Sequence, residues 1–252
     1  MISRNGSLAP VADANGITYN DAAGAEVRKL GWYQVTMIFF VWSIAGLVLE
    51  EVWMLLSMGK VQSRAGLVWG PFSPLYGTGA VLLTAVLLRL HDIGATRRQV
   101  FMASALVGGI LEQATGWAMQ TFLGIVSWDY ISGGVPFALT KWVAVPFLVG
   151  WGGLGCLWDR LVMPGLLHVI GGPTTKKRLT FAVLLGVFLV LDIVVTLCCF
   201  GRMVERGANI PPGNPIEEWV DDTYDDTFVA NRFQNWEDAS TPGVTLGEAM
   251  DS

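Results

Sequence analysis

The chain has 252 residues, of which 52% are hydrophobic and only 15% are charged. Soluble domains usually carry about 25% charged residues, so this composition excludes an ordinary soluble protein. The balance of 16 basic and 21 acidic residues leaves no basic field for nucleic acid. Three cysteines and two histidines exclude a disulfide-framed module and a histidine-rich metal site. The sequence therefore indicates an integral membrane protein in the lipid bilayer, and we expect no cofactor and no metal.

A bilayer core about 30 Å thick needs roughly 20 apolar residues in a helix. Five stretches approach this length and predict membrane spans: residues 32–58, 71–90, 99–123, 142–158 and 179–200. The fourth is short, rich in glycine and interrupted by Pro146. The apolar segment 161–170 is too short to span and contains Pro164, so we expect an interfacial or re-entrant piece. The predicted fold is an all-α bundle of about five transmembrane helices.

Three regions follow from this pattern. Residues 1–30 lack the basic start and apolar run of a signal peptide, and we expect a flexible N-terminal tail. Residues 31–201 form the predicted transmembrane domain. Residues 202–252 contain eleven acidic residues and three arginines, a net charge of −8, and predict a soluble acidic C-terminal tail.

The positions of the cations predict the orientation, because cytoplasmic loops are rich in lysine and arginine. One side of the five predicted spans would hold ten cations: Arg4, Arg28, Lys29, Arg89, Arg97, Arg98, Arg160, Lys176, Lys177 and Arg178. The other side would hold six: Lys60, Arg64, Lys141, Arg202, Arg206 and Arg232. We therefore expect a multi-pass protein of the cell membrane with a cytoplasmic N-terminus and an extracytoplasmic C-terminal tail.

Ionisable residues inside predicted spans are candidates for function, because each costs a few kcal/mol to insert. The depths of these residues along their spans predict that three acids meet two cations near the outer leaflet: Glu50, Glu112, Asp192, Lys141 and Arg64. The cluster has two interpretations, a functional pocket or ion pairs that hold the helices in register. Glu112 is the strongest candidate, because glycines before and after it let a neighbouring helix approach closely.

Three segments carry a resemblance to a known family. The first runs from Trp42 to Glu50, the second is Gly66-Leu-Val-Trp-Gly-Pro-Phe-Ser-Pro-Leu-Tyr-Gly77, and the third starts at Glu112 and is followed by Trp128-Asp129-Tyr130. Together they resemble the CmpB-like membrane family, which is labelled ABC-transporter type IV permease and is related to transmembrane protein 229. The resemblance covers about residues 39–192.

The resemblance implies which residues occupy the marked positions of the family. These are Glu50, Gly70, Pro71, Pro74, Tyr76, Gly77, Glu112, Trp128, Asp129, Tyr130, Lys141 and Asp192. The sequence departs from the family pattern at two positions. The cation before the Gly-Pro element is shifted by one residue, to Arg64, and Gln120 stands where the family has a second acid. Trp128 and Tyr130 also fit an interfacial aromatic belt, and Asp129 could pair with Lys141 or Arg64.

The family label predicts a permease-like component of unknown substrate with an outer-leaflet polar pocket. The chain has no P-loop, so ATP hydrolysis would need a separate ATPase subunit on the basic cytoplasmic loops. We also expect a homo- or hetero-oligomer, because five spans are few for a pathway. Two alternatives remain open: a non-catalytic envelope assembly or sensor protein, and a membrane enzyme acting on a lipid or envelope precursor with Glu112 or Asp129 as acid or base. His91-Asp92 is interpreted as a juxtamembrane turn.

Overall fold

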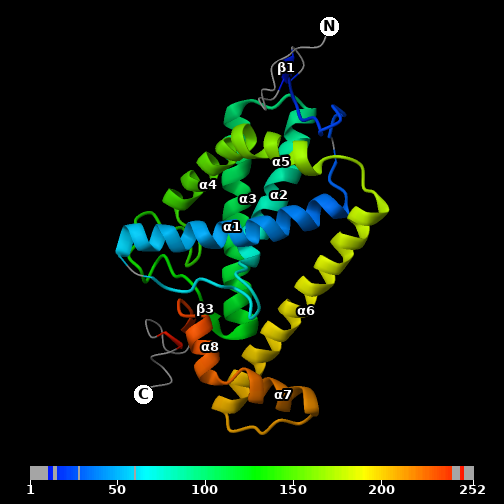
Figure 1. The fold of residues 1–252 in the computed structure, drawn as a ribbon. Coiled ribbons are helices and arrows are strands. Elements are labelled where there is room, and N and C mark those ends of the chain that lie inside the picture. Colours follow the sequence, from blue (N-terminus) through cyan, green and yellow to red (C-terminus); the bar gives the residue numbers. More distant parts are fainter. Residues whose placement is uncertain (1–10, 14–15, 28, 60, 240–244, 247–252) are drawn as a thin grey trace.

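The computed structural model describes residues 11–13, 16–27, 29–59, 61–239 and 245–246. It is mostly helical, and Figure 1 shows β1 and α5 at one end and α7, α8 and β3 at the other. The helices are α1 (Trp32–Met58), α2 (Pro74–Asp92), α3 (Arg97–Ala118), α4 (Val145–Leu157), α5 (Met163–Ile170), α6 (Lys176–Gly207), α7 (Pro215–Thr223) and α8 (Asp226–Arg232), with π-helical turns η1 (Met119–Leu123) and η2 (Trp158–Val162). Two antiparallel pairs join β1 (Val11–Asp13) to β2 (Gly16–Thr18) and β3 (Ile125–Val126) to β4 (Glu237–Asp238).

The first two predicted helices form close to their expected positions. α1 has the predicted bounds, and α2 begins three residues later than predicted, at Pro74. The delay has a local cause. Gly70 turns the backbone with φ 64°, Ser73 is extended, and Pro74 then starts the helix, where its missing N–H is not needed.

The fourth predicted region differs most from expectation. α4 has 13 residues and is about 20 Å long at 1.5 Å per residue. The helix does not stop there, because η2 and α5 continue it to Ile170 without a break. Segment 161–170 is therefore a continuation of α4, and its interfacial or re-entrant placement stays a prediction.

Three of the described helices are long and apolar enough to cross a membrane. These segments are Trp32–Leu56, Pro74–Asp92 and Lys176–Gly207. Their outward faces are strongly apolar, with exposed side chains such as Leu49, Trp53 and Val190. The structure thus supports a helical membrane protein, whereas five spans and the orientation of the termini stay predictions.

α1 lies across the front of α2 and α3 (Figure 1). Small residues allow this close crossing. A Cβ atom at Gly46 would lie 2.3 Å from Tyr76, and one at Gly77 would lie 2.6 Å from the Phe39 carbonyl oxygen. The crossing brings the middle of α1 onto the start of α2.

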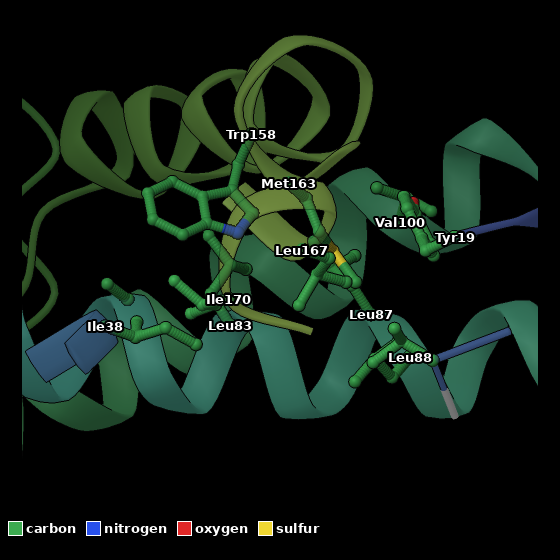
Figure 2. Close-up of a cluster of buried hydrophobic side chains, with 12 residues drawn as sticks. Tyr19, Ile38, Leu83, Leu87, Leu88, Val100, Trp158, Met163, Leu167 and Ile170 are labelled. Atoms are coloured by element: carbon green, nitrogen blue, oxygen red, sulfur yellow. The ribbon is translucent and has the colours of Figure 1, made fainter. Parts of the chain in front are cut away.

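A hydrophobic core at one end joins the N-terminal segment to the helices (Figure 2). Leu87 from α2 and Met163 and Leu167 from α5 are fully buried in it. Trp158 closes the cluster and donates a hydrogen bond from its indole to the Thr84 hydroxyl at 3.1 Å. Residues 16–27 of the predicted flexible tail pack here through Tyr19 and Val27. The predicted boundary at residue 30 stays a prediction.

A second core lies at the opposite end and is formed largely by residues of the predicted acidic tail. Phe200 of α6 packs against Phe233 and Trp236, with ring centroids 4.8 and 4.9 Å away. Arg202 of α6 pairs with Asp221 of α7 at 2.6 Å. α7 and α8 are thus held on the end of α6, and the part of residues 202–252 that the structure describes is folded.

Candidate functional site

Glu112 lies inside the bundle on the face of α3 that packs against α4. It is only 7% exposed. Its Oε1 accepts a hydrogen bond from the Trp151 indole at 2.9 Å and one from the Tyr130 hydroxyl at 3.4 Å. Its Oε2 is buried and has no hydrogen-bond partner among the described residues. Because buried polar atoms are normally paired, this half-satisfied carboxyl group marks the centre of the candidate site.

Two glycines position the groups around Glu112. A Cβ at Gly108 would lie 2.0 Å from the Trp151 ring, and one at Gly116 would lie 2.2 Å from the Trp142 ring. The glycines therefore open space on α3 for the two indoles. This is the close approach that the sequence predicts around Glu112, and the neighbouring helix is α4.

Glu50 forms a second polar group where α1 meets the start of α2. Its Oε1 lies 3.4 Å from Arg64 Nη1, and the Tyr76 hydroxyl donates a hydrogen bond to the carboxylate. The neighbouring Glu51 accepts a hydrogen bond from the Arg64 backbone N–H at 3.4 Å. The side chains of Glu50 and Arg64 are 26% and 15% exposed, so this group lies nearer the surface than Glu112.

Tyr130 connects the two groups. Its hydroxyl donates to Glu112, and it interacts electrostatically with Glu50 and with Tyr76. Burial, together with the Glu112 charge and hydrogen bond, raises the pKa of the Tyr130 hydroxyl. We refer to Glu50, Arg64, Tyr76, Glu112 and Tyr130 as the carboxyl–tyrosine cluster. Its members come from α1, α2, α3 and the two connecting segments.

The loop that carries Tyr130 is braced by Asp129. The carboxylate accepts hydrogen bonds from the backbone N–H groups of Ile131 and Ser132, each at 3.0 Å, and lies 3.8 Å from Lys141 Nζ. Burial tends to raise the pKa of Asp129, but the hydrogen bonds of Ser132 and the charge of Lys141 outweigh it and hold the pKa below its usual value. Trp128 donates from its indole to the Trp142 carbonyl at 3.2 Å. Of the two partners considered for Asp129 in the sequence analysis, Lys141 and Arg64, the structure shows Lys141.

Lys141 also contacts Gln120, the position at which the sequence resemblance implies an acid. Its Nζ donates a hydrogen bond to Gln120 Oε1 at 2.9 Å. An acid at this position would therefore face the cation. In the described residues, Lys141 bonds to Asp129 and Gln120 rather than to Glu50 or Asp192.

Asp192 lies apart from these groups and holds the Gly-Pro segment against α6. It is fully buried, and its Oδ1 accepts the backbone N–H of Trp69 at 2.9 Å. Thr196, one turn further on, accepts the backbone N–H of Val68 at 2.9 Å. Asp192 Oδ2 is buried and unpartnered among the described residues. The structure therefore gives Asp192 a role in anchoring the backbone before Gly70 and Pro71.

The C-terminal segment contacts the same loop from the other side. Arg232 donates to the Leu67 carbonyl at 3.0 Å and to the Gly70 carbonyl. Gln234 accepts the backbone N–H of Ser63 at 2.9 Å through its side chain. Residues 237–238 pair with strand β3, just ahead of Trp128. The C-terminal segment thus ties together the two connecting segments that carry Arg64 and Tyr130.

A further polar cluster, which the sequence did not predict, lies at the opposite end of the bundle. The Tyr19 hydroxyl donates to Asp159 Oδ1 at 2.6 Å, and His91 Nε2 lies 2.5 Å from the same oxygen. Burial and the Asp159 contact raise the pKa of Tyr19. The sequence signal for this cluster is Asp159, an acid in the apolar region between the predicted fourth span, which ends at residue 158, and the segment 161–170.

The described residues contain no group of three or more His, Cys, Asp or Glu side chains arranged to hold a metal ion. The candidate site is therefore a cluster of carboxyl, hydroxyl and guanidinium groups. These groups can bind cations or exchange protons, and Arg64 can bind an anion.

The fold and the site together define a helical membrane protein with carboxyl groups buried among apolar helices. The family model described as "Putative ABC-transporter type IV" matches residues 37–197, more than half of the chain. The chain belongs to this CmpB-type family. No curated protein and no solved structure is significantly similar to it.

Proposed function

We propose that this protein is the permease component of an ABC-type transporter and that the carboxyl–tyrosine cluster is its polar substrate site. The observation that supports the proposal best is the half-satisfied carboxyl of Glu112, buried among residues of α3, α4 and the loop after η1. A side chain that served packing alone would be satisfied on both oxygens or replaced by an apolar residue, because burying an unpaired charge is costly. The substrate and the direction of movement are left open by this proposal.

The proposed topology keeps five spans, a cytoplasmic N-terminus and the folded C-terminal segment outside. α3 with η1, and α4 with η2 and α5, would supply the two spans beyond the three apolar helices. With this topology the carboxyl–tyrosine cluster faces the outer half of the bilayer. Arg4, Arg28 and Lys60, which contributed to the predicted orientation, lie outside the described residues.

A separate ATPase would bind the basic end of the bundle. Exposed cations gather there on the α2–α3 turn and at η2 and the start of α6: Arg89, Arg97, Arg98, Arg160, Lys176 and Lys177. None of these six has an ion pair within the part of the chain that the structure describes. Such a surface favours an acidic partner and increases its rate of association.

Affinity purification in mild detergent, followed by mass spectrometry, tests this proposal. We expect an ATPase subunit to co-purify and the double variant Arg97→Glu, Arg98→Glu to reduce its recovery. Glu218→Lys is the matched control, because Glu218 is an exposed residue of α7 at the other end of the bundle. It should leave the recovery of the ATPase unchanged. Full recovery with the double variant would contradict the docking surface. A preparation that retains a Glu112-dependent activity without any ATPase would favour the membrane-enzyme alternative.

A further inference from the structure

Charge compensation around Glu112 is incomplete. Both donors, Trp151 and Tyr130, bond to Oε1, and Oε2 is buried without a partner among the described residues. The two cations of the predicted cluster are engaged elsewhere, since Arg64 pairs with Glu50 and Lys141 with Asp129. A proton on Oε2 would remove the uncompensated charge.

The groups that contact Glu112 are neutral. α4 presents the indole of Trp151, and the loop after η1 presents the hydroxyl of Tyr130. The charged groups of the neighbouring elements contact one another instead: Arg64 contacts Glu50 and Glu51, and Lys141 contacts Asp129 and Gln120. Because Glu112 has no cation as partner in the described contacts, burial disfavours a full negative charge on its carboxyl group.

One hydroxyl group is hydrogen-bonded to Glu112. The Tyr130 hydroxyl donates to Glu112 Oε1 at 3.4 Å. Hydroxyl groups both donate and accept, so Tyr130 can take a proton on one side while releasing its own on the other.

We propose that Glu112 is a proton-binding site and that the Tyr130 hydroxyl exchanges this proton with water. In this step the O–H bond of the Glu112 carboxyl breaks, the Tyr130 oxygen accepts that proton, and Tyr130 passes its own proton to a water molecule. Tyr130 is regenerated, Glu112 is left as a carboxylate, and the reverse step restores its proton. The proposal rests on the site of the proposed function but does not need an ATPase.

Infrared difference spectroscopy of the full-length protein in detergent tests the proton on Glu112. We expect a protonated-carboxyl C=O band in the wild-type protein at neutral pH and the loss of one such band per molecule in Glu112→Gln. Glu218→Gln, an exposed acid on α7, is the matched control and should leave the band unchanged. A wild-type spectrum without the band would overturn the proposal and does not depend on any variant folding.

The rate at which the band shifts in D₂O tests the connection through Tyr130. Tyr130→Phe removes the hydroxyl next to Glu112 and should slow the shift, whereas Tyr33→Phe, remote from the cluster, should not. An unchanged rate in Tyr130→Phe would overturn the tyrosine connection. If the Glu112 band is present but no ATPase co-purifies, the proton site stands and the transporter assignment fails. If an ATPase co-purifies but the Glu112 band is absent, the proton site is wrong and the transporter assignment stands.

Discussion

Lys141 contacts one neutral and one acidic partner. Its ammonium group donates to Gln120 Oε1 at 2.9 Å and lies 3.8 Å from Asp129 Oδ2. The contact with Gln120 is thus a hydrogen bond without an opposite charge, and the only carboxylate paired with Lys141 among the described residues is Asp129.

An acid at position 120 should strengthen the contact with Lys141. Gln120→Glu replaces a neutral hydrogen bond by an ion pair with Lys141, and we expect a gain of about 0.2–1 kcal/mol, as for other partly exposed pairs. Thermal unfolding in detergent measures the gain. Gln113→Glu is the control, because Gln113 accepts from the Thr140 hydroxyl and has no cation as partner in the described contacts. An equal gain in both variants would contradict the pairing with Lys141.

Asp129 predicts the pH dependence of its loop. Its pKa in the folded protein lies below the usual value of 3.8, so the carboxylate form stabilises the loop. This stabilisation is present above the usual value and is lost as the pH falls through the lowered pKa. Hydrogen–deuterium exchange of the 129–134 peptide should therefore increase in acid in the wild-type protein. Asp129→Asn should show faster exchange of this peptide than the wild-type protein at neutral pH. Its exchange should then change little further, relative to wild type at the same pH, as the solution is acidified.

At the scale of elements, glycines decide how closely α3 and α4 pack. Gly108 and Gly116 receive indole rings, whereas Gly150 and Gly153 on α4 have open space where a Cβ would lie. The glycines of α4 therefore have two roles. Gly152 and Gly155 allow the close approach of Phe101 and Ser104 of α3, whereas Gly150 and Gly153 face away from this interface.

This difference gives a matched pair of substitutions. Gly116→Ala places a methyl group 2.2 Å from the Trp142 ring, and we expect a destabilisation of about 1–3 kcal/mol from overpacking. Gly153→Ala meets no atom within 4 Å and should be neutral or stabilising by up to about 1 kcal/mol, because alanine favours the helix. Thermal unfolding in detergent compares them. Similar losses in both variants would contradict the proposed interface.

The helices could be predicted from the sequence because apolar runs of bilayer length leave few other structures. All five residues of the carboxyl–tyrosine cluster were candidates from the sequence: Glu50, Arg64 and Glu112 through their expected depth, and Tyr76 and Tyr130 through the family resemblance. The contact of Asp192 with the Trp69 backbone could not be predicted, because depth along a span does not give the direction of a side chain around its helix. α1 also lies across α2 and α3, which the pattern of apolar residues does not indicate (Figure 1).

At the scale of the whole molecule, segments far apart in the sequence close both ends of the bundle. Tyr19 reaches Asp159 at one end, and Arg232 holds the Gly-Pro segment at the other. These contacts could not be predicted from the sequence, because they join regions assigned to tails with helices assigned to the membrane. No local pattern at either partner indicates the other.

The contact of Tyr19 with Asp159 should contribute to the stability of the whole bundle. We expect a coupling energy of about 1.5–3 kcal/mol between Tyr19→Phe and Asp159→Asn in a double-mutant cycle, as for hydrogen bonds to charged groups. Asp92→Asn, an exposed acid beside His91, replaces Asp159→Asn in the control cycle and should show no coupling to Tyr19→Phe. Additive effects of the first pair would show that the hydrogen bond contributes nothing measurable.

The contact between Tyr19 and Asp159 also has a consequence for biogenesis. During synthesis the ribosome must add 140 further residues after Tyr19 before its acceptor exists. The N-terminal segment that carries Tyr19 therefore cannot form this contact while α1, α2 and α3 are synthesised. It can bind in its native position only after α4 has been made. We therefore expect the N-terminal residues, although they are synthesised first, to be among the last to reach their folded positions.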